Sequence, residues 1–568
     1  MWVRSLLVVA LVAAFLLPAM YRRQRRRAGQ RAGELSPTWR KRLVAVTGLS
    51  MVILVGGLAG VAAADGDPNG ANTPAAAVAP DNPQPMDTLT AQVAKHETAI
   101  NLTWLMVGGV LVLFMQAGFA LVETGFTRAK NGAHTMMMNL VIFAIGAVGW
   151  FVCGFAFMFG STSNAVIGLS TTSTSWHLGS WNLLAHHGFF LGGSAYDVSV
   201  MAFFFFQLVF MDATATIPTG AMAERWKFSS FITWGFFASM LLYPVYGNWV
   251  WGGGWLAQLG MQGPKWGHGA LDFAGSGVVH GMGGVAAFWG AKILGPRLGK
   301  FDENGKPRAI PGHHLPMAFL GTMILLVGWM GFNGASTFAA TDFRFTVVIT
   351  NTILCSAFAC LTTMFTMWKV YGKPDPSMTC NGLLAGLVAI TAPCAFVAPW
   401  AAAVIGIAAG FLVVAAVVLV EHKAKVDDPV GAVAVHGVNG LWGVLALGLF
   451  ADGKYSAGMG ADGKIGPVKG LFYGDTGQFL AQLTSAIVLV AWCSLACIVF
   501  FTICKKTVGM RSTEEAEIAG LDLPEMGALA YPDFLEAQGG VFASAGSGSG
   551  GSATPAKGKD ARDEVASK

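Results

Sequence analysis

The sequence predicts an all-α polytopic membrane protein, on the strength of its composition and its apolar patterning. Of the 568 residues, 54% are hydrophobic and only 12% are charged, whereas a soluble domain carries about 25% charged residues. Long apolar segments recur between residues 98 and 505. Most are long enough to cross a hydrocarbon layer about 30 Å thick as an α-helix. Gly contributes 74 residues, which suits closely packed membrane helices.

The N-terminal residues 1–64 are expected to form a targeting region. A Lys-Arg pair precedes the apolar run 43–61 and the Ala-Ala-Ala site 62–64, a pattern typical of a cleavable signal peptide. A retained N-terminal helix is the alternative. Residues 65–97, rich in Ala, Pro, Asn and Asp, are expected to form a flexible exported linker.

Eleven apolar segments are expected to be the transmembrane helices of a membrane domain spanning residues 98–505. Their expected bounds are 99–123, 136–160, 198–222, 229–251, 272–294, 316–334, 344–368, 379–393, 397–421, 432–451 and 480–504. The eighth and tenth segments are short for a span, so their ends are the least well defined.

Basic residues are distributed unevenly between alternate connections, which predicts the orientation. The set that includes 292–308 and the stretch after residue 505 holds most of the Lys and Arg residues. The other set, which includes the loops 161–197 and 452–479, holds few. The positive-inside rule therefore places the N-terminus outside and the C-terminus inside. Residues 506–538 would form a cytoplasmic tail, and 539–568, a Gly/Ser/Ala low-complexity stretch, would be disordered.

Several functional classes are disfavoured by the composition. The net charge of +5 fits the loop bias and gives no reason to expect nucleic-acid binding. The eight Cys residues lie in or at the ends of apolar runs without a CxxC pair, so they are expected to be small core residues rather than metal ligands. No nucleophile–base or metal-binding constellation stands out, so we expect neither an enzyme nor a cofactor.

A nine-residue pattern, Asp-x-x-Gly-x-x-x-x-His, occurs twice. The copies are Asp272-Phe-Ala-Gly-Ser-Gly-Val-Val-His280 and Asp428-Pro-Val-Gly-Ala-Val-Ala-Val-His436. Each places a His about 12 Å into an apolar segment, near the centre of the hydrocarbon layer. Ionisable groups at that depth mark a substrate or proton path by default.

The two copies are expected to enter the membrane from opposite faces. The fifth segment would run inward and the tenth outward, so segments one to five and six to ten would form an inverted 5+5 repeat, a known transporter plan. The Asp of each copy would cap its helix, and Gly275 and Gly431 would allow close helix approach.

Three roles are open to the pair His280 and His436. Two His without further ligands make a poor metal site, so no metal is expected. They could be satisfied core residues, although burial in a membrane makes that less favourable. The preferred hypothesis is that they line a narrow pore, hydrogen-bond to a small polar solute and relay its proton.

The chain closely resembles the ammonium transporter (Amt/Mep/Rh) family. The resemblance covers about residues 99–532 and is carried by the Asp272–His280 motif with Gly290-Ala-Lys-Ile-Leu-Gly-Pro-Arg297, Ala223-Glu224-Arg225, Val250-Trp251-Gly-Gly-Gly254, Gly331-Phe332-Asn333-Gly-Ala-Ser336, and Asp427-Asp428-Pro429 through His436-Gly437. The bacterial type of the Amt branch is favoured, because an outer Trp and Ser are both present. The resemblance implies a homotrimer with one pore per protomer in the bacterial inner (plasma) membrane, transporting ammonium or ammonia.

The resemblance also assigns site residues. Phe210, Trp251 and Ser336 would bind ammonium at an outer recruitment site, and Phe210 with Phe332 would form a gate. His280 and His436 would line the pore and relay the proton, while Asp272 and Asp428 would support the site. Without the resemblance, the aromatic residues would first be read as packing or interfacial anchors. Gln207, Phe206 and Trp329 are further pore-lining candidates.

The cytoplasmic tail resembles the family tail at Glu514-Glu515 and from Gly520 to Phe534, but Pro524-Glu-Met-Gly-Ala528 departs from it. A PII-type nitrogen-signalling partner is therefore a weaker expectation. Two other functions remain open: an ammonium sensor or receptor that signals through this tail, and an Rh-like gas channel. The presence of Trp251 and Ser336 disfavours the gas channel.

Overall fold

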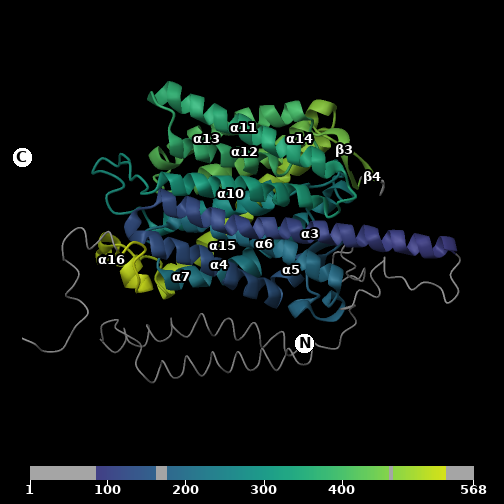
Figure 1. Cartoon of the computed structure of the whole chain (residues 1–568), viewed down its shortest axis with the longest axis horizontal. Coiled ribbons are helices and arrows are strands. Elements are labelled where there is room, and N and C mark those ends of the chain that lie inside the picture. Colours follow the sequence, from purple (N-terminus) through teal and green to yellow (C-terminus); the bar gives the residue numbers. More distant parts are fainter. Residues whose placement is uncertain (1–84, 161–174, 460–464, 533–568) are drawn as a thin grey trace, which may run out of the picture.

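The computed structural model describes residues 85–160, 175–459 and 465–532 (Figure 1). The expected signal peptide in 1–64 and the low-complexity tail 539–568 lie outside these residues.

The fold is built from α-helices, several of them interrupted by single π-helical turns. The α-helices are α3 (Pro85–Phe126), α4 (Gly132–Gly149), α5 (Phe155–Phe159), α6 (Val198–Met222), α7 (Phe228–Phe237), α8 (Tyr243–Val250), α9 (Met282–Leu294), α10 (Leu315–Gly334), α11 (Arg344–Tyr371), α12 (Pro376–Ile390), α13 (Pro399–His422), α14 (Asn439–Phe450), α15 (Thr476–Thr507) and α16 (Glu514–Ala519). The π-helical turns are η3 (Trp150–Gly154), η6 (Ala238–Leu242), η8 (Ser276–Gly281), η10 (Val433–Val438) and η12 (Asp522–Met526). Short 3₁₀ turns are η2 (Ala129–Asn131), η4 (Phe189–Leu191), η5 (Gly193–Ala195), η7 (Ala257–Gly260), η9 (Ala335–Thr337) and η11 (Leu471–Tyr473).

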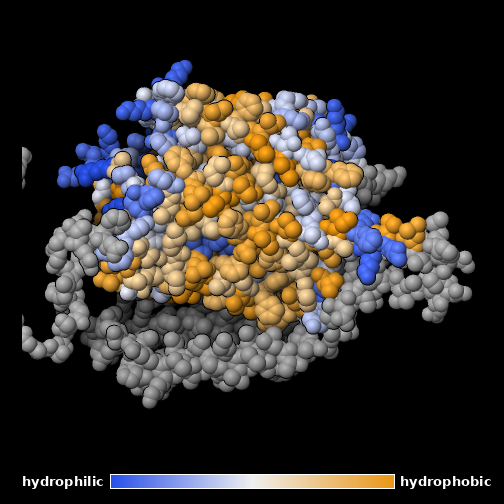
Figure 2. Space-filling model, in the orientation of Figure 1, coloured by the Kyte–Doolittle hydropathy of each residue, from blue (hydrophilic) through white to orange (hydrophobic). Residues whose placement is uncertain are grey.

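Helices occupy each of the eleven segments expected from the sequence, and the protein is an all-α polytopic membrane protein. Within the described residues, 9 helices are long and apolar enough to cross a membrane, and α12 is a shorter apolar helix. The space-filling view shows a broad apolar band between two ends where hydrophilic residues gather (Figure 2). That all eleven segments cross the membrane stays a prediction.

The first helix differs from the expectation at both ends. α3 begins at Pro85 and ends at Phe126, so residues 85–97 are helical where a flexible linker was predicted. Pro at the start of a helix pre-sets the backbone angle that the first turn needs. Neither Gly nor Pro occurs again until Gly108, so nothing in the sequence interrupts the helix. Its N-terminal turns project beyond the rest of the bundle (Figure 1).

Two β-hairpins lie in the connections predicted to face outside. β1 (Ser175–Leu178) pairs antiparallel with β2 (Trp181–Ala185), and β3 (Asp452–Met459) pairs antiparallel with β4 (Ile465–Lys469). The β3–β4 hairpin lies at the opposite end of the bundle from α16 (Figure 1). The predicted outer loops therefore contain short sheets.

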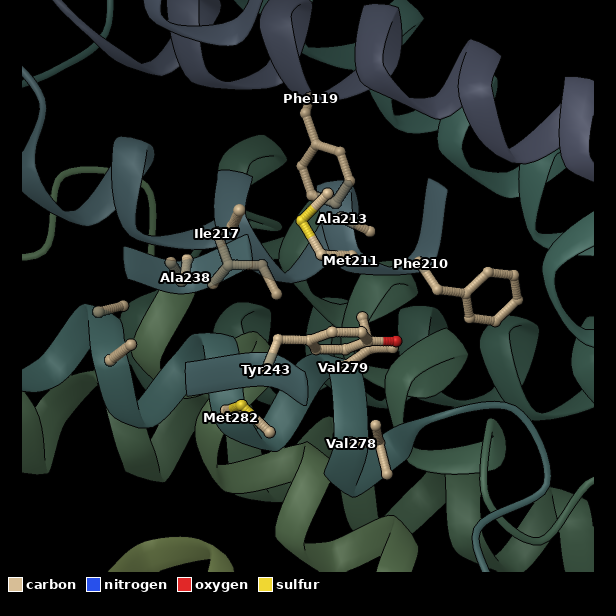
Figure 3. Packing of buried hydrophobic residues seen from close by; sticks show 14 of the residues in the cluster. Phe119, Phe210, Met211, Ala213, Ile217, Ala238, Tyr243, Val278, Val279 and Met282 are labelled. Atoms are coloured by element: carbon tan, nitrogen blue, oxygen red, sulfur yellow. The ribbon is translucent and has the colours of Figure 1, made fainter. Parts of the chain in front are cut away.

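A continuous apolar core fills the bundle between these ends. Figure 3 shows part of it, in which Phe119 of α3, Phe210 and Ile217 of α6, Val279 of η8 and Met282 of α9 point into one interior. All five side chains are buried. The helix that carries the first Asp–His motif, η8 continued by α9, thus packs directly against α6.

Candidate functional site

The first Asp–His motif forms a helix start buried inside the protein. The Asp272 Oδ1 atom accepts a hydrogen bond from the Gly275 N–H at 2.8 Å, and Oδ2 accepts from Gly277 at 2.8 Å and from Val278 at 2.9 Å. These are backbone donors that a helix start leaves without an intrahelical partner. The carboxylate therefore caps η8, as the sequence predicted.

Asp428 caps the second motif in the same way. Its Oδ1 accepts from Gly431 at 3.0 Å and its Oδ2 accepts from Val433 at 2.7 Å. The motif glycines also have a role that was not predicted. Gly275 has φ +113° and Gly431 has φ +81°, conformations that side chains with a Cβ disfavour. They therefore allow the chain to turn back onto its capping Asp, and at Gly431 a Cβ would in addition lie 2.7 Å from Asn381 Nδ2 of α12.

The two motif helices touch at four other glycines, which lie one and four residues after each motif His. They are Gly281 and Gly284 in the first helix and Gly437 and Gly440 in the second. A Cβ added to Gly284 would overlap the Gly437 backbone, and a Cβ added to Gly440 would lie 2.6 Å from the Gly281 nitrogen. Corresponding positions of the two copies thus meet in a reciprocal crossing. Small residues at such crossings let helix backbones approach closely.

This crossing brings the two imidazoles into direct contact. His436 Nδ1 and His280 Nδ1 lie 3.2 Å apart, and the rings are stacked with centroids 5.3 Å apart. Both side chains are buried. Each ring lies in a π-helical turn, η8 or η10, where the sequence predicted regular α-helix. Such turns are frequent at functional sites.

The shared contact constrains the protons of the pair. An Nδ1–Nδ1 hydrogen bond requires one nitrogen to donate and the other to accept. The His280 Nε2 atom has no hydrogen-bond partner among the described atoms. It can therefore bond to a solute that enters the pore.

A cavity of about 320 Å³, called the vestibule below, lies on the β3 side of the His pair. Its lining includes Gln207, Phe210, Trp251, Asp272, Ser336, Phe338 and Ser456. The Trp251 indole N–H donates to the Asp272 carbonyl at 2.6 Å, which fixes the ring. The Ser336 hydroxyl donates to the Phe332 carbonyl at 2.8 Å, so its oxygen can still accept a bond from a solute. The structure thus brings the three predicted recruitment residues together.

Two stacked rings separate the vestibule from the His pair. The Phe210 and Phe332 centroids lie 4.0 Å apart at an interplanar angle of 28°, and both rings are buried. Phe332 in turn stacks on His280, with centroids 5.4 Å apart. The order along the path is therefore vestibule, Phe210, Phe332, His280 and His436.

The three further candidates take distinct positions. Gln207 lines the vestibule, and its Oε1 atom has no partner among the described atoms. Phe206 lies behind the first gate ring, 4.7 Å from Phe210 between centroids. Trp329 stacks on His280 at 4.9 Å and is held by a 2.9 Å hydrogen bond to the Thr391 hydroxyl.

A second, much smaller cavity of about 20 Å³, called the inner cavity, lies beyond the His pair. Its lining includes Phe119, Glu123, Ile217, Asn381, Val430 and His436. A space of this size holds about one water molecule. The sequence reasoning missed Glu123, because that residue closed the first expected segment and was read as its boundary. α3 continues to Phe126, so Glu123 lies inside the helix. An ionisable side chain inside an apolar membrane segment marks a substrate or proton path by default, as for the two His residues.

A buried ionic network lies at the end of the bundle that carries α16. The Arg297 guanidinium contacts Asp427 at 2.9 Å and Glu224 at 2.7 Å, and Arg128 also pairs with Glu224. Burial alone would raise the pKa of the Asp427 carboxyl, but the nearby Arg225 and Arg297 guanidinium groups hold it well below its usual value. The network ties together the connections after α3, α6, α9 and α13.

The C-terminal tail is docked on this end of the bundle. The Asp522 carboxylate accepts from the His134 backbone N–H at 2.9 Å, and the Glu525 carboxylate accepts from the Phe228 N–H at 3.2 Å. Lys130 donates to the Glu517 carbonyl at 2.7 Å. The tail segment that departs from the expected pattern, around η12, is thus packed against α4 and α7.

Comparison with known proteins agrees with this geometry. The sequence model of the Ammonium Transporter Family matches residues 103–531. The ammonium transporter Amt2 of Archaeoglobus fulgidus is 46% identical over 476 residues, which is 84% of this chain and 93% of that protein. The ammonium transporter 1 member 3 of Solanum lycopersicum is 36% identical over 448 residues, 76% of this chain and 93% of that protein.

Solved structures give the same result. A structure named Sensor Amt Protein matches with a TM-score of 0.66 and 33% identity, covering 76% of this chain and 99% of that one. The structure of Mep2 from Candida albicans matches with a TM-score of 0.63 and 28% identity, covering 76% of this chain and 90% of that one.

Proposed function

The chain belongs to the ammonium transporter family and transports ammonium across a membrane, and we propose that the vestibule, the Phe pair and the His pair form its pathway. The observation that carries this proposal is the 3.2 Å contact between His280 and His436. It lies between the vestibule and the inner cavity, behind a pair of stacked Phe rings.

Recruitment of the cation takes place in the vestibule. An ammonium ion over the faces of Trp251 and Phe210 gains about 2 kcal/mol or more once it is desolvated. The Ser336 oxygen accepts one of its N–H groups, because the hydroxyl hydrogen is already committed to the Phe332 carbonyl. The Asp272 carboxylate, engaged by three backbone N–H groups, holds the loop that positions Trp251.

The solute passes the Phe pair without its charge. Transferring a bare ion into a dry, low-dielectric path costs many kcal/mol, whereas a neutral amine needs only hydrogen bonds. Ammonium therefore deprotonates near Phe210 and Phe332 and continues as ammonia along the imidazoles. Potassium has no proton to release, so the same energy barrier excludes it.

The proton follows separately through the His pair. Protonation of His280 at Nε2 and release of the Nδ1 proton toward His436 moves one proton across the contact. His436 then releases its Nε2 proton inward, which leaves both imidazoles neutral, with His436 as the donor and His280 as the acceptor of their contact. Transport by this route carries net positive charge inward.

The reciprocal glycine crossing supports the inverted 5+5 repeat. Gly284 meets Gly437 and Gly440 meets Gly281, as a two-fold axis in the membrane plane would require. We extend the proposal to eleven transmembrane helices with the N-terminus outside and the C-terminus inside. The basic connections and α16 then face the cytoplasm.

The assembly and cellular setting belong to the same proposal. The protein forms a homotrimer in the bacterial inner membrane, with one pore in each protomer and a cleaved signal peptide before the membrane domain. The tail from α16 onward exposes Ile518 and Leu523, which offers a cytoplasmic docking surface for a PII-type protein.

A sensing role is the second candidate, and the docked tail favours it. The hydrogen bonds of Asp522 and Glu525 connect the tail directly to α4 and α7, so a change in the bundle can reach the tail. One structural relative is named a sensor. A protein that only senses ammonium would bind it without passing current.

The deciding experiment is current from the purified full-length protein in vesicles on a solid-supported membrane. We expect a transient current after an ammonium pulse and none after a potassium pulse. Folded protein that gives no ammonium current would contradict the proposed pathway and favour the sensor.

A further inference from the structure

We propose that Glu123 is the inner proton acceptor of the pathway, receiving through one water molecule the proton that arrives on His436. This inference rests on the proton relay proposed above and assigns its next step to a residue of α3. Three features of the inner cavity support it: the position of the carboxyl group, its lack of a neutralising cation, and its hydrogen bonds.

Glu123 borders the same small space as the second imidazole. Glu123 and His436 both line the inner cavity of about 20 Å³, which has room for about one water molecule. Phe119 lies one helical turn before Glu123 on α3, and its ring centroid is 6.0 Å from that of His436. A single water in this cavity, bordered by both residues, is the bridge that the proposal requires.

Within the described residues, no positive side chain forms an ion pair with Glu123. Among the ion pairs of the described residues, none includes this carboxylate, although only 3% of the residue is exposed. A buried carboxylate without a cation is costly, because its charge is taken from water without compensation. It therefore favours taking up a proton that reaches the inner cavity.

The surrounding polar side chains are oriented toward the carboxyl group. The Asn139 amide donates to Glu123 Oε2 at 2.7 Å. Gln116 donates to Asn139 Oδ1 at 3.2 Å, which turns the nitrogen of that amide toward Glu123. The Thr219 hydroxyl lies 2.8 Å from each carboxyl oxygen.

The Thr219 hydroxyl allows two protonation states with the same heavy-atom positions. Its oxygen lies 2.8 Å from Glu123 and also 2.5 Å from the Thr216 carbonyl, but a hydroxyl has one hydrogen. When Glu123 is a carboxylate, the hydroxyl donates to it. When Glu123 is protonated, its O–H can donate to Thr219, and the hydroxyl donates to the Thr216 carbonyl instead. Uptake and release of the proton need no rearrangement of the helices.

The transfer balances in protons and charge. The N–H bond of the His436 imidazolium breaks as an O–H bond forms on the bridging water, and another O–H of that water breaks as the carboxyl O–H forms. Imidazolium and carboxylate thereby become two neutral groups. The carboxyl O–H then breaks as an N–H bond forms on ammonia that has crossed the pore, which yields ammonium and restores the carboxylate.

The test separates charge movement from passage of the neutral amine. Full-length protein is reconstituted, ammonium-evoked current is recorded on a solid-supported membrane, and alkalinisation of dye-loaded vesicles reports neutral ammonia entry above a protein-free control. In Glu123→Gln, we expect the current to fall at least tenfold and the alkalinisation to rise above that of the unsubstituted protein, because ammonia then enters without its proton. Glu123→Asp, which keeps an ionisable group, should restore a substantial part of the current.

A matched control removes another buried carboxylate. Asp212 lies on α6, is 2% exposed and lines neither the vestibule nor the inner cavity, so Asp212→Asn should keep both signals. Unchanged current in Glu123→Gln would overturn the inference. So would loss of the current with no rise in alkalinisation and no rescue by Glu123→Asp, because that pattern indicates a structural role.

The His436→Ala variant distinguishes this inference from the proposed pathway. If His436→Ala loses selective current while Glu123→Gln keeps it, the relay stands and the role of Glu123 is wrong. If His436→Ala itself keeps a selective current, the relay fails and the assignment of Glu123 fails with it.

Discussion

The helix crossing at Gly284 gives a sharp test of how backbone packing sets the His pair. A Cβ at Gly284 would overlap the Gly437 backbone, whereas a Cβ at Gly437 would lie 3.3 Å from the nearest atom of Gly284. Alanine at the first position must push the two motif helices apart, but alanine at the second needs a shift of only a few tenths of an ångström. The two substitutions add the same methyl group at one crossing, so each is a control for the other.

The magnitude follows from the contact between the imidazoles. Their Nδ1 atoms are 3.2 Å apart, and a hydrogen bond is lost beyond about 3.5 Å, so a small separation of the helices breaks it. Overpacking of this kind costs about 1–3 kcal/mol of stability. We expect Gly284→Ala to lower the ammonium current at least tenfold, to unfold at a lower temperature and to exclude potassium still, because both imidazoles and the Phe pair remain in the path.

The assay combines the solid-supported-membrane current with thermal unfolding followed by tryptophan fluorescence in detergent. Gly437→Ala should keep at least half of the current and unfold near the temperature of the unsubstituted protein. Equal behaviour of the two variants, whether both are impaired or both are normal, would refute the account of the crossing.

Two further predictions concern the two ends of the pathway. Ser336→Ala removes one hydrogen-bond acceptor of the cation, which costs about 1 kcal/mol of binding free energy. The ammonium concentration for half-maximal current should therefore rise about fivefold, while the maximal current stays the same. An unchanged half-maximal concentration would show that Ser336 does not bind the cation. Asp427→Asn removes one of the two carboxylates that pair with the buried Arg297 and should cost about 3 kcal/mol of stability at neutral pH, seen as a lower unfolding temperature. The folded-state pKa of Asp427 is depressed, so the contribution of this carboxylate to the free energy of unfolding is present above about pH 4 and is lost as the pH falls through the folded pKa. If the difference in stability between Asp427→Asn and the unsubstituted protein closed between pH 7 and pH 5, this assignment would be contradicted.

Hydropathy located the helices well because each span needs a long apolar segment, but it located polar helix ends poorly. The first expected segment began at residue 99, whereas α3 begins at Pro85. The turns from Thr88 to Glu97 are polar, and a hydropathy pattern cannot distinguish a helix in water from a linker. The hairpins β1–β2 and β3–β4 were not predicted for a related reason, because short strands joined by turns carry little periodic hydrophobic signal.

The His pair could be predicted from spacing, but its geometry could not. The sequence placed His280 and His436 at equal depth, and the structure brings their Nδ1 atoms into contact. The π-helical turns that carry them lie beside the glycine crossing, which brings together residues far apart in the sequence. The role of Gly275 was misjudged because a glycine in a motif can serve a turn or a helix contact, and only its φ of +113° decides between them.

The most direct test of the central claim is the ion selectivity of the protein without its imidazoles. His280→Ala and His436→Ala, each reconstituted as full-length protein, are pulsed with ammonium and then with potassium at equal concentration on a solid-supported membrane. The account predicts that each variant either loses the ammonium current or passes potassium as well, because the separate proton path is gone. Ammonium currents of unchanged size and selectivity in both variants would contradict the claim that the His pair carries the proton.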